Sequence, residues 1–390
     1  MPTSPDSASR AGARKIVTLF GTRPEIIKLA PVIQALGRLD AGRERIDLVN
    51  VDSGQHAHLV RPFAEAFGIH IHRDLGVGRP DQTASGILSR VVEAFDKLLE
   101  RLAPDIVLVQ GDTTTAMSGA IAAFHRNIPV GHVEAGLRSG NLHSPFPEEM
   151  NRRLIGRIAS LHLAATARNV AILKAEGVAD EDIVQTGNPV VDAVKFALEH
   201  TTPSDRAREL QGAVEGSRLI VVTTHRRESF GDVMIERLRV LAAFMADHAD
   251  VSLVFPVHPN PNVRRAVEQA LPPSDRVHLV EPLGYLDFIH VLSRAWLIVS
   301  DSGGVQEEAP TLGKPVLVIR ENTERPEAVE AGVARLVGRS AATLADLLDE
   351  CYRSSAWIDE VRSIENPFGA PGSADRIAAA VKGFLDRQSG

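Results

Sequence analysis

The chain has 390 residues, of which 44% are hydrophobic and 24% charged, and its formal net charge is −7 at pH 7. This length exceeds one ordinary hydrophobic core and predicts two domains, and the composition is that of a globular protein. Both signs of charge are spread along the chain, so the sequence indicates no basic face for nucleic acid.

The single cysteine, Cys351, excludes an internal disulfide and a cysteine-built metal site. The apolar runs are shorter than the roughly 18 residues that a membrane span requires, so we expect no membrane partner. Residues 1–14 are rich in Ser, Ala, Pro and Arg and lack an apolar stretch for export. We therefore expect a disordered leader over 1–14 and a cytoplasmic protein.

From residue 15 onward, short apolar runs alternate with longer segments of helical pattern. Continuous runs of Val, Ile and Leu predict strands that helices bury on both faces, and hence two doubly wound parallel sheets. In the first half we expect strands at 15–20, 46–51, 105–110, 128–133, 161–166 and 182–187. In the second half we expect them at 219–224, 252–257, 277–282, 297–300, 315–320 and 334–338. The segment 186–189 is the expected hinge, and a helix is expected over 373–385.

Ligands of doubly wound sheets bind beyond the carboxyl ends of the strands, and polar clusters follow several of the predicted strand ends. The sequence GTRPE, over 21–25, ends the first strand and opens a helix that carries Lys28. Arg23 and Lys28 would supply positive charge to a diphosphate, although a helix start with a surface Arg and Lys explains them as well. The spacing is not that of a Walker loop, so ATP hydrolysis is not indicated.

Further acids stand at or near strand ends in the first half. Asp112, in QGDTTT, either faces a ligand or caps the next helix, which is the commoner role for such an Asp. Glu134 ends an apolar strand and stands between two glycines. Its side chain is expected to point into a cleft between the two predicted sheets. Glu148 and Glu149 begin a helix, where acids usually complement the helix dipole, and Glu148 could pair with Arg152 four residues on.

The second half offers a histidine and an anion site. His225 follows the strand at 219–224, beside two arginines, so it would donate to a phosphate or protonate a leaving group, unless it is a satisfied structural histidine. A strand that breaks at Ser302, Gly303 and Gly304 and turns into a helix leaves backbone N–H groups unpaired. These groups and the helix dipole suit a phosphate, although an ordinary strand-to-helix turn has the same sequence.

Two charged residues follow this turn. Glu308 lies one helical turn beyond Gly304, within reach of a ribose hydroxyl. Arg325 follows the next strand in a polar loop and would close over the same anion. None of the clusters has metal-ligand spacing, and no strand end carries G-x-G-x-x-G, so we expect no metal and no other cofactor.

The chain resembles the non-hydrolysing UDP-N-acetylglucosamine 2-epimerases in the order of its motifs, which are GTRPE, GDTTT, HVEAGLRSG, PFPEEMNRR, HRRESFG, PVHPNP, DSGGVQEEAP and ERPEAV. The resemblance extends from about Lys15 to the last helix. It implies the GT-B fold, in which two Rossmann-like domains with parallel sheets face each other and the C-terminal helix crosses back to the first domain. The implied N-terminal domain comprises 15–186 and 370–390, and the implied UDP-binding domain comprises 187–369.

The resemblance also implies a reaction. Members of this family convert UDP-GlcNAc reversibly to UDP-ManNAc, by elimination of UDP to 2-acetamidoglucal and re-addition of UDP. The expected partners are therefore a UDP-sugar and a second copy of the chain in a homodimer. A GT-B glycosyltransferase, a hydrolysing epimerase that releases ManNAc and UDP, and a catalytically silent nucleotide-sugar sensor are the alternatives.

By resemblance, the site residues fall into groups. Those matched to catalysis are Asp112, Glu134 and Glu148, with His225 at the UDP group. Those matched to substrate binding are Arg23, Lys28, Arg152, Phe288 (at the uracil), Ser302, Gly303, Gly304, Glu308 and Arg325. Those in the region of an activating second UDP-GlcNAc site are Gln55, His56, Arg79 and Gln82. The sequence there, SGQHAHLV, departs from the more usual TGQH-x-E-M form.

Overall fold

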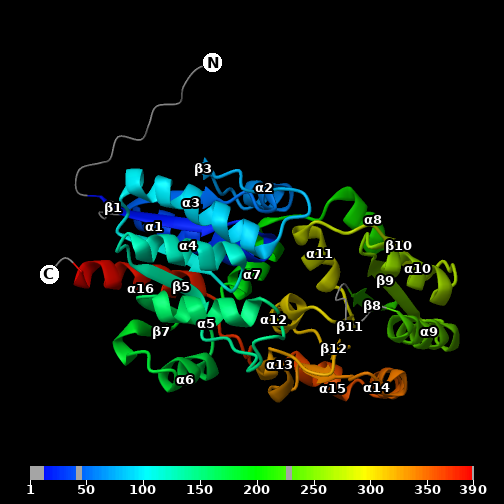
Figure 1. The fold of residues 1–390 in the computed structure, drawn as a ribbon. Helices are drawn as coiled ribbons and strands as arrows, with labels where there is room; N and C mark the ends of the chain where they lie inside the picture. Colours follow the sequence, from blue (N-terminus) through cyan, green and yellow to red (C-terminus); the bar gives the residue numbers. More distant parts are fainter. Residues whose placement is uncertain (1–12, 41–45, 225–230, 389–390) are drawn as a thin grey trace. The chain divides into compact units, whose positions relative to one another are not determined.

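The computed structural model describes residues 13–40, 46–224 and 231–388 (Figure 1). The chain divides into two compact units, with boundaries after Ala193 and after Phe368. The N-terminal unit holds the described residues up to Ala193 together with those from Gly369 onward, and the C-terminal unit holds Val194–Phe368. The expected leader lies outside the described ranges except for its last two residues, and the first strand already begins at Arg14.

In the described part of the N-terminal unit, one parallel sheet has the strand order β3-β2-β1-β4-β5-β6-β7. The order reverses between β1 and β4, which is the switch point where doubly wound sheets bind ligands. The strands are β1 (Arg14–Phe20), β2 (Ile46–Asp52), β3 (Arg73–Asp74), β4 (Ile106–Gln110), β5 (Val130–Ala135), β6 (Leu161–Ala164) and β7 (Ile183–Gln185).

Helices connect these strands and cover the sheet. They are α1 (Arg23–Asp40), α2 (Ala57–Ala66), α3 (Ala84–Leu102), α4 (Thr114–His125), α5 (Glu148–Ile158), α6 (Ala167–Ala175), the 3₁₀ turn η1 (Asp180–Asp182) and α16 (Ser373–Arg387). The helix α7 (Val190–His200) begins in the N-terminal unit and continues into the C-terminal unit. The helix α3 shows why such segments fold: it buries Ile87, Val91, Phe95 and Leu98 in one stripe spaced by three and four residues. Full burial of each such side chain stabilises the fold by about 1.5–3 kcal/mol.

The last helix returns to the N-terminal unit, as predicted. Asp192, on α7, caps the start of α16, because its carboxylate accepts from the backbone amides of Gly372 at 2.6 Å and Ala374 at 2.7 Å. The Ser373 hydroxyl donates to the Gly187 carbonyl at 2.8 Å, and Arg376 Nε donates to the Thr186 carbonyl at 2.7 Å. These bonds hold α16 against the segment 186–188. That segment was the expected hinge, which stays a prediction.

The C-terminal unit is built around a second parallel sheet, which within the described ranges has the order β10-β9-β8-β11-β12-β13. Its strands are β8 (Arg218–Thr223), β9 (Val251–Pro256), β10 (Val277–Val280), β11 (Leu297–Ser300), β12 (Val316–Val318) and β13 (Ala334–Leu336). Its helices are α8 (Asp205–Ala213), α9 (Asp232–Asp247), α10 (Pro261–Ala270), α11 (Tyr285–Leu292), α12 (Gly303–Leu312), α13 (Pro326–Glu330), α14 (Ala341–Arg353) and α15 (Ala356–Val361). None of the helices in the described ranges is long and apolar enough to cross a membrane.

Two parallel-sheet units confirm the predicted architecture, and most strands lie within two or three residues of their expected positions. The strand expected at 128–133 lies instead at Val130–Ala135, so it includes Glu134 rather than ending before it. The short strand β3 is absent from the prediction because Arg73 and Asp74 are exposed and form no apolar run. The switch point β1/β4 brings the loops after these two strands together in the N-terminal unit. In the C-terminal unit the strand order reverses between β8 and β11.

Candidate active site

Glu134 occupies an unusual backbone position in β5. Its φ angle is +67°, in the left-handed region that residues with a side chain rarely adopt. The pairing of β5 with β6 shifts register between Val133 and Ala135, which is a bulge at Glu134. Bulges re-aim a side chain at the end of a strand, and such a conformation typically costs about 1–3 kcal/mol. The fold therefore maintains a strained backbone to place this carboxylate.

The carboxylate of Glu134 is buried and accepts hydrogen bonds from several elements. Lys28 Nζ, on α1, lies 2.5 Å from Oε1, and Asn188 Nδ2 lies 3.4 Å from the same oxygen. Gln110 Nε2, at the end of β4, donates to Oε2. A buried carboxylate is tolerated when a cation and further donors compensate it in this way. Lys28, which we expected at a diphosphate, thus lies at the acid.

Asp112 lies directly after the end of β4 and is half-buried. Its Oδ2 accepts from Arg152 Nε at 2.8 Å and Nη2 at 2.6 Å, and its carbonyl oxygen accepts from Asn151 Nδ2 at 2.8 Å. The cap of α4 is Thr113, whose hydroxyl accepts from the Ala116 amide at 2.9 Å. The alternative role of Asp112 as the helix cap is therefore wrong, and an arginine from α5 orients its carboxylate instead.

The two acids that begin α5 differ in their surroundings. Glu148 is half-buried, whereas Glu149 is fully buried. Glu149 accepts from the Ser139 amide at 2.8 Å, from Arg152 at 3.3 Å and from Arg153 at 3.1 Å. Burial alone would raise the pKa of Glu149, but the amide and the two arginines outweigh it and hold the pKa below its usual range. Glu149 is thus a buried anchor for Arg152.

Sequence reasoning missed several members of this cluster. Gln110, Asn188 and Glu149 stand inside motifs that the sequence singled out, but no pattern distinguishes them from ordinary polar residues. Glu25 is fully buried although it is the third residue of α1, a position where an acid is usually solvated. Burial raises the pKa of Glu25 to about 7, against hydrogen bonds from Thr113 and from the start of its own helix that lower it.

The residues expected at a second nucleotide-sugar site lie together in the N-terminal unit. Gln82 Nε2 donates to the Gln55 carbonyl at 3.2 Å, and the Arg79 amide donates to Gln82 Oε1 at 3.2 Å. The His56 amide donates to the carbonyl of Gly21 at 3.0 Å, at the end of β1. Burial, reinforced by neighbouring His58, lowers the pKa of His56. The structure thus connects all four predicted residues to the carboxyl edge of the first sheet.

In the C-terminal unit, the predicted anion site is the turn from β11 into α12. Ser302 caps α12, with its hydroxyl 3.5 Å from the Val305 amide, while Gly304 is exposed. A Cβ on Gly304 would lie 3.7 Å from Ser302 Oγ and 4.0 Å from Glu308 Oε1, so the cap and the acid flank this glycine. The first turn of a helix offers amide donors and a positive dipole to a phosphate.

The remaining predicted residues are distributed over both units. Arg325 immediately precedes α13 and is buried, with Nε 2.5 Å from Glu307 Oε1 and Nη1 3.7 Å from Glu324. Phe288, on α11, is half-buried, and Arg23, at the start of α1, is exposed. His225 lies outside the described residues.

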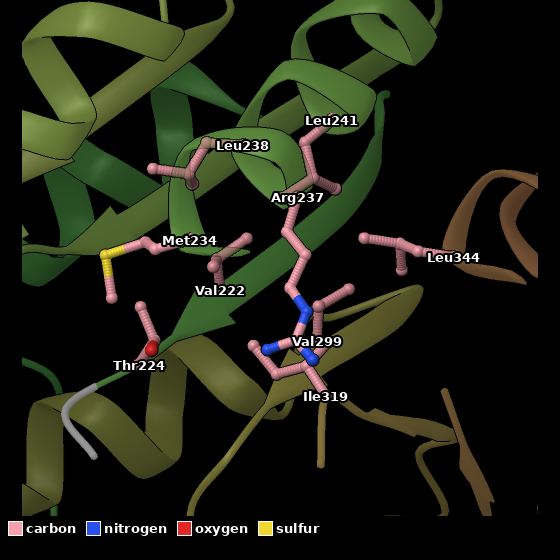
Figure 2. Close-up of a pocket in the computed structure, with 9 residues that line it drawn as sticks. All are labelled: Val222, Thr224, Met234, Arg237, Leu238, Leu241, Val299, Ile319 and Leu344. Carbon is pink, nitrogen blue, oxygen red and sulfur yellow. The ribbon is translucent and has the colours of Figure 1, made fainter. Parts of the chain in front are cut away.

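A further buried cation lies under the sheet of the C-terminal unit. Arg237, on α9, lines a cavity of about 10 Å³, and Figure 2 shows its guanidinium beside Val299 and Ile319. Its Nη2 donates to the Gly338 carbonyl at 2.6 Å. Burial lowers the pKa of Arg237, and the negative charge of Asp301 opposes this shift. Asp301 lies between β11 and Ser302. The positive charge of Arg237 therefore acts near the strand end that leads into α12.

The N-terminal unit supplies acids and cations, and the start of α12 in the C-terminal unit supplies helix-start donors. The N-terminal unit holds Asp112 and Glu134 at the ends of neighbouring strands, and a Cβ on Gly111 would lie 3.5 Å from Glu134 Oε2. Carboxyl groups held in this way suit proton transfer. Among the residues that the structure describes, no three His, Cys, Asp or Glu side chains are grouped to hold a metal ion.

Known proteins resemble this chain in sequence and fold over nearly their whole length. A family model described as UDP-N-acetylglucosamine 2-epimerase matches residues 40–382. A probable UDP-N-acetylglucosamine 2-epimerase of Ralstonia nicotianae is 42% identical over 377 residues, covering 95% of this chain and 100% of the relative. The UDP-N-acetylglucosamine 2-epimerase of Escherichia coli K12 is 41% identical over 373 residues, covering 94% of this chain and 98% of the relative.

Solved structures give the same result. The crystal structure of UDP-GlcNAc 2-epimerase from Neisseria meningitidis bound to UDP-GlcNAc matches with a TM-score of 0.87 at 38% identity. That match covers 95% of this chain and 100% of the Neisseria chain, and it confirms the GT-B fold class. With the family model and relatives matching almost end to end, the chain belongs to the UDP-N-acetylglucosamine 2-epimerase family.

Proposed function

We propose that this chain interconverts UDP-GlcNAc and UDP-ManNAc by a non-hydrolysing route, with 2-acetamidoglucal as the intermediate. The observation that carries the proposal is the carboxylate of Glu134, which a strained strand end holds buried beside Lys28 and next to the loop of Asp112. Relatives over 40% identical carry the epimerase name, and the Neisseria structure contains UDP-GlcNAc.

The chemistry explains why acids and anion-binding groups are both needed. The proton on C2 of the sugar is not adjacent to a carbonyl carbon, so a carboxylate cannot remove it directly. When the C1–O bond breaks and its electron pair leaves with UDP, positive charge builds at C1 and acidifies that proton. A carboxylate then takes the proton as the C1–C2 double bond forms.

The return reaction uses the same groups in reverse. The UDP oxygen adds to C1, and a carboxylic acid returns a proton to C2 from the opposite face. We assign these proton transfers to Asp112, Glu134 and Glu148 together, because the reaction needs carboxyl groups on two faces of the ring. Arg152 holds Asp112 by two short bonds, which fits a carboxylate whose orientation matters.

We assign the nucleotide to the C-terminal unit. The start of α12, at Ser302, Gly303 and Gly304, would donate to the diphosphate, with Glu308 at the ribose. Phe288, half-buried on α11, is assigned to the uracil. Lys28 belongs to the acid cluster in this account, since Glu134 is its partner at 2.5 Å. Arg23, Arg325 and His225 are retained as groups that would bind the leaving diphosphate.

We also propose a homodimer. The neighbouring helices α4 and α5 expose Phe124 and Leu154, with exposed fractions of 58% and 42%. Large apolar side chains on adjacent helices are typical of an interface between subunits. Light scattering after gel filtration should give twice the chain mass, and a monomer mass would contradict the assignment.

Proton NMR of the enzyme with UDP-GlcNAc as the only substrate tests the proposed reaction. We expect UDP-ManNAc to appear and to reach equilibrium with UDP-GlcNAc, without accumulation of free UDP. A hydrolysing epimerase would release ManNAc and UDP, a glycosyltransferase without acceptor would form no UDP-ManNAc, and a silent sensor would leave the spectrum unchanged. Each of these three outcomes would contradict the proposal.

A further inference from the structure

Glu25 connects two loops at the switch point of the first sheet. Its Oε2 accepts from the amides of Gly21 at 3.0 Å and Thr22 at 2.8 Å, in the loop between β1 and α1. Its Oε1 accepts from the hydroxyl of Thr113 at 2.6 Å, in the loop between β4 and α4. Thr113 is adjacent to Asp112. One buried carboxylate therefore joins the loop of Arg23 to the loop of a proposed catalytic acid.

The loop between β1 and α1 also packs against the first turn of α4. A Cβ on Gly21, directly after β1, would lie 2.8 Å from Thr115 Oγ1 and 1.9 Å from Ser53 Oγ, so a side chain there would displace these hydroxyls. Ser53 and Thr115 are themselves 3.1 Å apart through their hydroxyls. The bonds of Glu25 therefore stand next to a second, direct contact between these two segments.

A role in helix capping alone does not account for Glu25. An acid in a first turn normally complements the dipole while remaining solvated, and such an interaction is worth about 0.3–1 kcal/mol. Glu25 is instead completely buried, and burial raises the pKa of its carboxyl to about 7. A buried carboxyl is costly unless its hydrogen bonds are worth more, and here they join two loops rather than one.

We propose that Glu25 is a positioning residue, which fixes the loop of Asp112 relative to the loop of Arg23 without touching the sugar. The inference rests on the proposed function for the roles of Asp112 and Arg23. The expected effect of Glu25 on the rigidity of the two loops does not depend on which reaction the protein catalyses.

Kinetics of two Glu25 variants test the proposal. Glu25→Ala should lower kcat for epimerisation by about 10- to 100-fold at a temperature where the variant is fully folded, because a small displacement of a catalytic group has that effect. Glu25→Gln should stay within about threefold of the wild type, since its amide oxygen accepts from Gly21 and Thr22 and its NH₂ donates to Thr113. Equal losses in both variants, or none in Glu25→Ala, would overturn the proposal.

The Thr113 hydroxyl provides the second arm. Thr113→Ala should lower kcat as Glu25→Ala does, Thr113→Ser should restore it, and the double variant should be no worse than Glu25→Ala. Loss of a helix cap by itself destabilises by about 1 kcal/mol. Ser340→Ala, which removes the cap of α14, is the matched control and should leave kcat unchanged. Additive losses in the double variant would show that the two residues act independently.

Hydrogen–deuterium exchange distinguishes failure of this inference from failure of the proposed function. In Glu25→Ala, peptides covering 21–25 and 111–116 should both exchange faster, while β6 and α16 keep their protection. Glu25→Gln should retain the wild-type pattern. Faster exchange in the first peptide alone would show that Glu25 orders only the start of its own helix. That result would overturn the proposal, whether or not the wild-type enzyme forms UDP-ManNAc.

Discussion

Lys28 Nζ lies 2.5 Å from Glu134 Oε1, and the two side chains are only 9% and 7% exposed. The pair joins α1 to β5 across β4, and both residues belong to the switch-point region of the first sheet. A buried ion pair of this kind contributes little net stability compared with apolar residues of the same size. Its presence at a strained strand end is better explained by the chemistry that we assign to Glu134.

Replacement of Glu134 by Gln tests that assignment. The variant keeps the shape of the side chain but cannot accept a proton from C2, so turnover should fall by at least about a hundredfold. UDP should still bind, because the nucleotide is assigned to the C-terminal unit, and calorimetric titration with UDP checks this. A near-normal rate would remove Glu134 from the mechanism.

Replacement of Lys28 by Met tests the pair itself. The change leaves the carboxylate of Glu134 buried without its cation, and the free energy of unfolding should fall by about 3–5 kcal/mol. Urea denaturation measures this loss. The double variant with Glu134→Gln should be more stable than Lys28→Met alone, since no uncompensated charge remains. An equal or greater loss in the double variant would show that the two residues are not energetically coupled.

The adjacent arginines of α5 form a matched comparison. Both contact Glu149, but only Arg152 also holds the carboxylate of Asp112. Arg152→Met should therefore lower kcat by about 10- to 100-fold, while Arg153→Met should remain close to the wild type. Steady-state kinetics with UDP-GlcNAc measures both. Similar losses in the two variants would indicate that anchoring of Glu149, rather than orientation of Asp112, supports activity.

His132 gives the fold a dependence on acid. It is buried in β5 with Nε2 2.8 Å from the Gly111 carbonyl, and burial lowers its pKa to about 3 from an ordinary 6.5. Below pH 6.5 the imidazole of His132 binds a proton in the unfolded chain but not in the folded chain. His132 therefore reduces the free energy of unfolding as the pH falls from 6.5 towards 3. His132→Gln should lack this contribution, a few kcal/mol, in urea unfolding at pH 4.5 compared with pH 7.5. An unchanged pH dependence would contradict the burial argument.

The sequence predicts the fold well where burial alone decides it. The run Leu297–Val299 is apolar and leads through Ser300 into a polar turn, and β11 has the predicted bounds. The predicted bounds of β5 were wrong because the apolar pattern that predicts a strand stops before Glu134, whereas the strand itself includes this residue. Its place there depends on the bulge and on donors from α1 and β4, which are distant in sequence.

The candidate site was predictable as a set of motifs but not as a set of contacts. The motif GDTTT indicates a strand end with a polar turn, and both Asp112 and Thr113 are good caps by residue type. Only the position of Arg152, forty residues later, shows that Asp112 faces α5 and leaves the capping role to Thr113. Glu25 likewise resembles a solvated first-turn acid until the burial of the whole loop is known.

The most direct test of the central claim is epimerisation of UDP-GlcNAc in deuterated water. If a carboxyl group removes the C2 proton and another returns one, solvent deuterium should enter C2 of UDP-ManNAc and, as the reaction reverses, of UDP-GlcNAc. Loss of the C2 proton signal in NMR and a mass increase of one unit report the exchange. Formation of UDP-ManNAc that retains the original hydrogen at C2 would contradict the account.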